Sequence, residues 1–367
     1  MGGPDNRMLW IRNLEGTAPG GRSHVVEAEL GAELQIPGLL DYADGAVLCG
    51  AATFSPDTTG LYKYCLRLRV PWSAEEGDES KEPLARGTRK GYLFREGPVG
   101  ELVALFSLCL QVRLFVLSTS PRGLSHRDLP IKTEFAPRRA RIDRHVDPIL
   151  FAQSDRNMCT SLGPFLDQIR SLPSKDHLDI AIAANHYARA LREIGIDEEM
   201  VFIRLVSAIE RVASEQPIPD DPLNSRRIEE FVRVDTLTGA QVDELRAMLQ
   251  TRRTKSRFIA FLVEHSTGFF DSEPREPTHT QVTPENLVAV AAAVYKARSA
   301  YLHNGDPMYF SRMTQFPDWH MDPSFGMIEQ DRSYTVEQKL PRADFFHRLV
   351  RHCLLMRIRK LTKAGAG

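Results

Sequence analysis

The sequence predicts an α+β protein, in which a β-rich N-terminal domain is followed by an all-α domain. Before about residue 145, short apolar or alternating runs are separated by Gly, Pro and Asp, as is typical of strands and turns. Beyond residue 146, apolar residues recur at helical spacing over long segments. A basic connector, PRRARIDR at residues 137–144, separates the two patterns. We therefore expect one domain over residues 1–145 and a second over residues 146–367.

Short runs of apolar and alternating residues predict the strands of the first domain. The alternation is clearest in YKYCLRLRV, and every run is bounded by turn-forming residues. The expected strands cover residues 8–11, 25–30, 46–54, 61–70, 91–94 and 114–117. Residues 101–113 have the length of a helix, and residues 73–90 have the composition of a loop.

Apolar residues at spacings of three and four predict the helices of the second domain. The expected helices cover residues 173–194, 197–214, 238–249, 255–264, 284–302 and 342–361. Ser174 is a candidate cap for the first of them. The clearest start is Thr283 followed by Pro284, a capping residue before a proline at the first helical position. That helix is expected to stop at the NGDP sequence of residues 304–307.

Composition excludes several classes of protein. Of the 367 residues, 42% are hydrophobic and 26% are charged, which excludes a wholly disordered chain. The net charge of −1 gives no support to a protein that coats nucleic acid, although 37 of the 47 basic residues are arginine, the better bidentate phosphate ligand. The 5 cysteines lack C-x-x-C spacing, so we expect neither a disulfide framework nor a zinc knuckle. No metal cluster is evident elsewhere, and we expect no cofactor. Without a visible signal peptide or spanning segment, the expected location is cytoplasmic, with no membrane partner.

One helix, expected from Pro284 onward, places an arginine on its apolar face. Leu287, Ala291 and Val294 form a stripe, and Arg298 falls within about 20° of Leu287 on an ideal helix. A guanidinium on an apolar face needs an anionic partner or ligand, because burying an unpaired charge costs several kcal/mol. An ion pair with Glu210, which lies at the margin of its own helix's apolar stripe, is one interpretation. A bound phosphate is another.

His303 lies one turn after Arg298, just before the expected cap at Gly305. A histidine at a helix C-terminus is a candidate general acid or base, and a candidate capping residue. Ser299 precedes His303 by four residues and lies on the same side of the helix. The R-x4-H spacing is not specific in a chain with this many arginines and 11 histidines. The surrounding sequence must therefore distinguish this pair from the others.

That context resembles a known family. The sequence YKARSAYLHNG at residues 295–305 is similar to the signature of HEPN domains (the higher eukaryote and prokaryote nucleotide-binding fold), especially of the Apea-like branch. HYARAL at residues 186–191, followed by FIRLVSAIE at residues 202–210, resembles the second conserved block of that family, which ends in a glutamate. Asn304 departs from the pattern, in which glycine commonly follows the histidine directly. The resemblance covers roughly residues 150–360.

The resemblance implies an HEPN-like helical bundle that cleaves RNA without a metal ion, at a composite site in a dimer interface. The 2′-hydroxyl of the RNA would attack the adjacent phosphorus. The implied catalytic residues are Arg298, Ser299 and His303, and the implied supporting residues are Glu210, Tyr301 and Asn304. The implied partners are RNA, a second copy or higher oligomer, and a regulatory protein, and the implied setting is a toxin or antiviral-defence effector. The front domain would sense, inhibit or recruit.

Two alternatives stay open. A non-catalytic HEPN module would dimerise and bind a nucleotide, nucleic acid or partner protein. A bare interaction scaffold would use Arg298 and Glu210 for stability alone. The basic residues of the last helix, among them Arg348, Arg351 and Arg359, predict either an RNA-binding groove or a solvated face.

Overall fold

The computed structural model describes residues 8–16, 23–52, 57, 60–71, 97–122, 158–214, 216, 254–272, 282–308, 340–341 and 343–365. The expected connector at 137–144, the domain boundary after residue 145, the loop at 73–90, the strand at 91–94 and the helix at 238–249 lie outside these residues.

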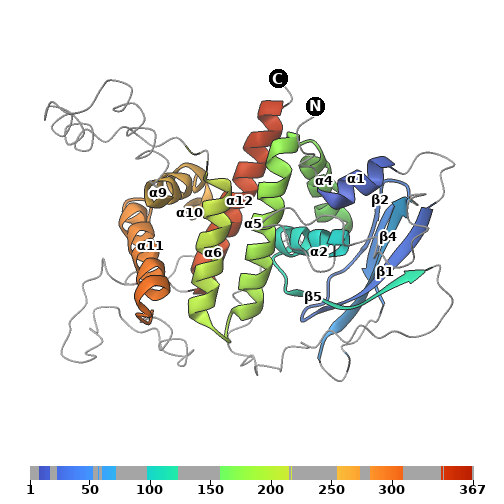
Figure 1. Cartoon of the computed structure of the whole chain (residues 1–367), viewed down its shortest axis with the longest axis horizontal. Helices are drawn as coiled ribbons and strands as arrows, with labels where there is room; N and C mark the ends of the chain where they lie inside the picture. The colour runs from blue at the N-terminus through green and yellow to red at the C-terminus, as the bar shows by residue number, and fades with distance from the viewer. Residues whose placement is uncertain are drawn as a thin grey trace, which may run out of the picture.

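The chain forms an antiparallel sheet in its N-terminal region and mostly helices after it, which confirms the mixed α and β content (Figure 1). The strands are β1 (Ser23–Ala32), β2 (Leu39–Tyr42), β3 (Val47–Ala51), β4 (Tyr62–Pro71) and β5 (Leu114–Arg122). The helices are α1 (Leu9–Gly16), α2 (Gly97–Leu110), α4 (Met158–Arg170), α5 (Ser174–Glu193), α6 (Glu198–Val212), α9 (Thr254–His265), α10 (Phe269–Ser272), α11 (Leu287–Asn304) and α12 (Ala343–Gly365). β2, α4 and α10 have no counterpart among the predicted elements.

The 5-stranded sheet has the order β2-β3-β4-β1-β5, and one of its faces packs against the core. Val26 of β1 lies opposite Leu68 of β4, and both side chains are buried. The next pair, Glu27 and Arg67, points to the other face and forms an ion pair. The alternation that predicted the strand at 61–70 is therefore the alternation between these two faces.

The expected strand at residues 8–11 is wrong, because these residues enter helix α1. Glu101 of α2 accepts the backbone N–H of Leu9 and of Trp10, each at 3.0 Å, and so caps the helix from a distant part of the chain. Trp10 is fully buried. A short apolar run does not distinguish a strand from a buried helix, and here the tertiary contact decides.

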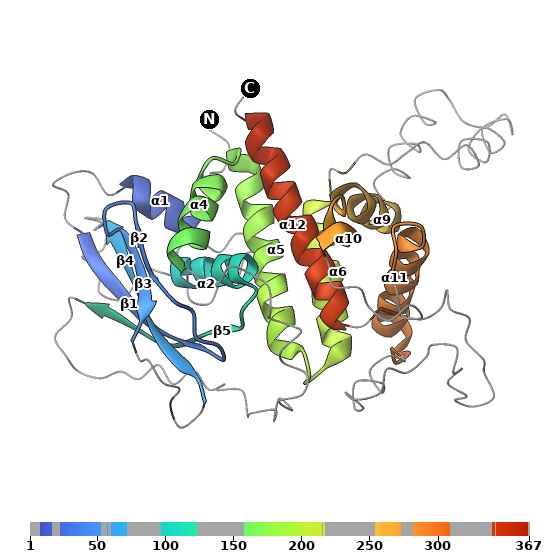
Figure 2. The same cartoon turned by 180° about the vertical axis from the view of Figure 1, so that it is seen from behind.

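Helices α5 and α6 form an antiparallel hairpin with α12 packed behind it, and α11 lies at the far edge of the bundle (Figures 1 and 2). Asp197 caps α6 by accepting the N–H of Met200 at 2.9 Å. Ser174 makes no capping bond, because it is already the first residue of α5. Helix α11 starts at Leu287 rather than at Pro284, since residues 284–286 form a turn.

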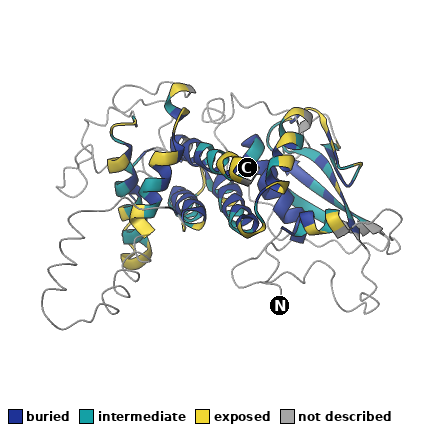
Figure 3. Ribbon diagram, turned by 90° about the horizontal axis from the view of Figure 1, so that it is seen from above, coloured by how far each residue is buried: buried dark blue, intermediate teal, exposed yellow. Residues whose placement is uncertain are grey.

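Helix α2 joins the sheet to the bundle, and apolar residues of both form one continuous core. The core runs along the inner face of the sheet and through the central helices (Figure 3). Arg351 of α12 donates to the carbonyls of Leu108 and Cys109 at the end of α2. Arg113 donates to the carbonyl of Ile194, with Nη2 at 2.6 Å. These guanidiniums donate to carbonyls at and just beyond helix ends, where the helix ladder runs out of N–H donors.

Among the residues that the structure describes, no helix combines the length and the apolar character needed to cross a membrane.

Candidate functional site

Helix α11 is a surface helix. Leu287, Ala291 and Val294 are its buried residues, which confirms the predicted stripe. Two large apolar side chains on the same helix are open to solvent, Val288 at 51% and Leu302 at 48% exposure. In Figure 3 the helices at this edge carry far more exposed and half-buried ribbon than the central ones. The helix therefore presents a partly apolar, solvent-exposed surface beside its polar residues.

Arg298 points from α11 toward α6 and is held there by a chain of hydrogen bonds. Its Nη2 donates to Oε2 of Glu210 at 2.9 Å, and the two side chains are 18% and 22% exposed. The Tyr295 hydroxyl donates to Oε1 of the same carboxylate at 2.9 Å. Thr254 of α9 lies 2.9 Å from that hydroxyl. Three helices thus fix the orientation of one guanidinium, and the ion-pair interpretation of Arg298 is confirmed.

Tyr295 contributes twice to this network. The Arg298 guanidinium carbon lies 5.8 Å from the centre of its ring, in cation–π geometry. Burial, together with the hydrogen bond to Glu210, raises the pKa of Tyr295, so that its hydroxyl stays a donor to the carboxylate. The Nε of Arg298 is buried and has no hydrogen-bond partner among the described residues. The guanidinium therefore retains donor capacity that Glu210 does not use.

The end of α11 presents the other predicted site residues. His303 and Asn304 are exposed in the last turn. Gly305 ends the helix with φ of 75°, and its N–H donates to the Tyr301 carbonyl at 3.0 Å. This left-handed conformation favours glycine, as the sequence predicts for the cap. The Tyr301 side chain packs partly buried against the core, and Ser299 is half-buried.

Arg298 and His303 do not come together within one chain. They lie on one continuous helix, about 140° apart around its axis and about 7.5 Å apart along it. Arg298 faces Glu210, whereas His303 stands in solvent at the end of the helix. A single phosphate can meet both groups only when a second copy of α11 supplies one of them.

The three arginines predicted to bind RNA on the last helix do not share an exposed face. Arg348 is 9% exposed, and Arg351 is bonded to the carbonyls at the end of α2. Arg359 is exposed, and its Nη1 lies 3.8 Å from the sulfur of Met356. Arg348 is therefore buried, and Arg351 points inward to the carbonyls of α2.

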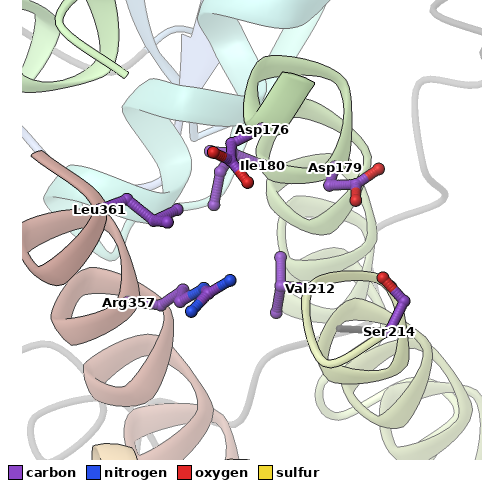
Figure 4. A pocket seen from close by; sticks show the side chains of 7 residues that line it. All are labelled: Asp176, Asp179, Ile180, Val212, Ser214, Arg357 and Leu361. Carbon is purple, nitrogen blue, oxygen red and sulfur yellow. The ribbon is translucent and has the colours of Figure 1, made fainter. Parts of the chain in front are cut away.

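A small cleft between α5, α12 and the end of α6 lies apart from these residues (Figure 4). Arg357 reaches from α12 toward Val212, near Asp176. Counting space open to solvent, the cleft holds about 250 Å³, which is below the usual range for ligand pockets. Within the described ranges, no three His, Cys, Asp or Glu side chains gather as metal ligands would.

Sequence reasoning missed two members of the Arg298 network. Tyr295 precedes Arg298 by three residues, and this spacing would have placed both on one face of the helix. Thr254 gave no signal, because it lies on another helix and meets Tyr295 only in the folded chain.

Glu210→Gln is expected to lower the free energy of unfolding by about 1–2 kcal/mol, because Arg298 loses a charged, partly buried partner. Chemical denaturation measures this change. Glu27→Gln is the matched control, since its partner Arg67 is 47% exposed and the loss there should stay below about 0.5 kcal/mol. Equal losses in the two variants would contradict a special role for Glu210.

The fold and the site together define a class: a mixed α and β protein whose surface helix holds a tethered arginine and an exposed histidine. The chain matches no family model, no curated protein and no solved structure.

Proposed function

We propose that this chain is a metal-independent endoribonuclease of the HEPN type, which acts as a homodimer. The observation that carries the proposal concerns α11, which holds Arg298 in an ion pair with Glu210 of α6 and exposes His303 at its end. Because the two groups diverge within one chain, the active site is composed of α11 helices from two copies. The exposed Val288 and Leu302 supply apolar area for that contact.

The reaction follows from the properties of these side chains. His303 takes the proton of the ribose 2′-hydroxyl, whose oxygen attacks the adjacent phosphorus. The bond to the 5′-oxygen breaks, and that oxygen receives a proton from water. The products are a 2′,3′-cyclic phosphate and a 5′-hydroxyl. Arg298 binds the non-bridging phosphate oxygens, where negative charge increases in the transition state, and Ser299 orients the reacting groups.

The test is cleavage of RNA by the purified protein in the presence of a chelator. The wild type is expected to cleave, and Arg12→Ala, an exposed change on α1, should cleave equally well. Arg298→Ala and His303→Ala should each lose activity. Equal cleavage by all four proteins would remove Arg298 and His303 from the mechanism.

A second candidate is a non-catalytic HEPN module that dimerises and binds a nucleotide, a nucleic acid or a partner protein. The ion pair itself favours it, because Glu210 already engages the guanidinium of Arg298. This candidate predicts no RNA cleavage in any condition, together with a weaker dimer after Arg298→Ala. Analytical ultracentrifugation of the two proteins separates the candidates.

The cellular setting belongs to the same proposal. A ribonuclease of this type, located in the cytoplasm, would act as a toxin or antiviral-defence effector on RNA. The sheet-containing N-terminal region would receive the activating signal or a regulatory protein. Neither a cofactor nor a metal ion is required by the chemistry above.

A further inference from the structure

We propose that the outer face of the α5–α6 hairpin is a phosphate-binding site, formed by Arg189, Arg204 and His186. The ligand class is a phosphate group, carried either by a small phosphate compound or by an RNA backbone. The site is separate from Arg298 and does not depend on RNA cleavage.

Helix geometry and two contacts between the helices place these residues together. His186 and Arg189 lie three residues apart on α5 and so share one side of it. Arg204 of α6 reaches toward α5, with its Nη2 3.8 Å from Oε1 of Glu193. Arg211 of α6 also reaches toward α5, where its Nη2 lies 2.6 Å from Oδ1 of Asp179. α12 packs against the opposite side of the hairpin (Figures 1 and 2).

Arg189 and Arg204 have no hydrogen-bonded carboxylate among the described residues, whereas Arg211 beside them is paired with Asp179. Arg189 is exposed and forms no ion pair within the described part of the chain. The carboxylates of Glu193 and Asp197 both act on the charge of Arg204, and that of Glu193, at 3.8 Å, lies beyond hydrogen-bond distance. The Nε of Arg204 is buried and has no hydrogen-bond partner in the described residues. Burial, and then the nearby charge of Arg189, lower the pKa of Arg204. Two adjacent guanidiniums thus repel each other until an anion joins them.

His186 completes the site as a neutral group. Its Nδ1 is buried and has no partner among the residues described. Burial, followed by the charges of Arg204, Arg189 and Arg211, lowers the pKa of His186 to about 4. The ring is therefore uncharged at neutral pH and adds a hydrogen-bond donor without adding to the repulsion.

A phosphate group matches these donors best. Guanidiniums bind phosphate oxygens in a bidentate manner, and a dianion neutralises both arginines at once. The site also differs in position from the Arg298 network, since Arg204 and Glu210 lie about 120° apart around α6. Arg298 of α11 therefore contacts α6 on a different side from the one that carries Arg204.

Binding of two probes to the full chain tests the proposal. Pyrophosphate is titrated by calorimetry, and a labelled single-stranded RNA is followed by fluorescence anisotropy in the presence of chelator. In Arg189→Ala/Arg204→Ala, the affinity for at least one probe is expected to fall about tenfold. For RNA, the slope of log affinity against log salt should shrink by about 1.4. The control is Arg12→Ala/Arg69→Ala, which removes the same charge from α1 and β4.

The melting temperature supplies a readout that a structural role would not give. Pyrophosphate should raise it in the wild type and in the control but not in the double variant, whose melting without ligand should be unchanged or higher. A loss of pyrophosphate binding alone identifies a small ligand, and a loss of RNA binding alone identifies the backbone. No binding by the wild type, or equal binding by all three proteins, would overturn the site. A protein that binds pyrophosphate here and cleaves no RNA would refute the ribonuclease proposal while leaving this one standing.

Discussion

A heterodimer that combines one Arg298→Ala chain with one His303→Ala chain is expected to cleave RNA at about half the rate of the wild-type dimer. Each single variant, as a homodimer, should lose about 100-fold to 10,000-fold, because each lacks either the proton-transfer group or the phosphate-binding group. The recovery follows from geometry. Since Arg298 and His303 diverge on one uninterrupted helix, each site takes its arginine from one chain and its histidine from the other.

The measurement needs two differently tagged chains that are expressed together and purified through both tags. In this heterodimer one site is intact and the other lacks both groups. A heterodimer of the wild type with Arg298→Ala/His303→Ala is the reciprocal control. It contains two half-sites and should be as inactive as a single variant. If the reciprocal control were active and the first heterodimer inactive, arginine and histidine would act from the same chain.

Glu101→Ala is expected to lower the free energy of unfolding by about 2–5 kcal/mol. Its carboxyl group is fully buried and accepts the N–H of Leu9 and of Trp10, so truncation leaves two donors without an acceptor and creates a cavity beneath α1. Denaturation followed by Trp fluorescence measures the loss. Glu15→Ala, an exposed change on the same helix, should stay within about 0.5 kcal/mol of the wild type.

The same carboxyl makes stability depend on pH. Burial raises the pKa of Glu101 from 4.5 to about 8, against the opposing effect of the two backbone N–H groups. Because the pKa is higher in the folded state, the stabilisation is fully present below pH 4.5 and is lost as pH rises toward 8. Relative to Glu101→Gln, the wild type should lose up to about 1.4 kcal/mol per pH unit over this interval. Parallel pH profiles of the two proteins would contradict the assignment.

Patterns that repeat along the chain predicted local structure well. The alternation around Arg67 reflects a strand with one buried face, and the stripe of Leu287, Ala291 and Val294 is the buried side of α11. Both patterns arise from a fixed repeat of the backbone, so they can be seen without the fold. The Gly305 cap was equally predictable, because a left-handed residue at a helix end strongly favours glycine.

Features fixed by distant contacts were not predictable in this way. The MLWI run forms a helix because Glu101, 91 residues from Trp10, supplies its cap. The inward direction of Arg351 follows from carbonyls at the end of α2, 242 and 243 residues away. The sequence predicted neither Glu101 as the cap of α1 nor the α2 carbonyls as the partners of Arg351.

By itself, the sequence determined the order of sheet and helices, the apolar stripe of α11, the position of its cap and the need of Arg298 for an anionic partner or ligand. These depend on periodicity and on the cost of burying a lone charge, which act within a few turns of chain. Only the tertiary structure decided that Glu210 is the partner of Arg298, that Thr254 bonds the Tyr295 hydroxyl, and that Arg189 lies near enough to Arg204 to act on its charge. The reason is physical: hydrogen bonds and charges act over a few ångströms, and helix packing chooses which groups come that close.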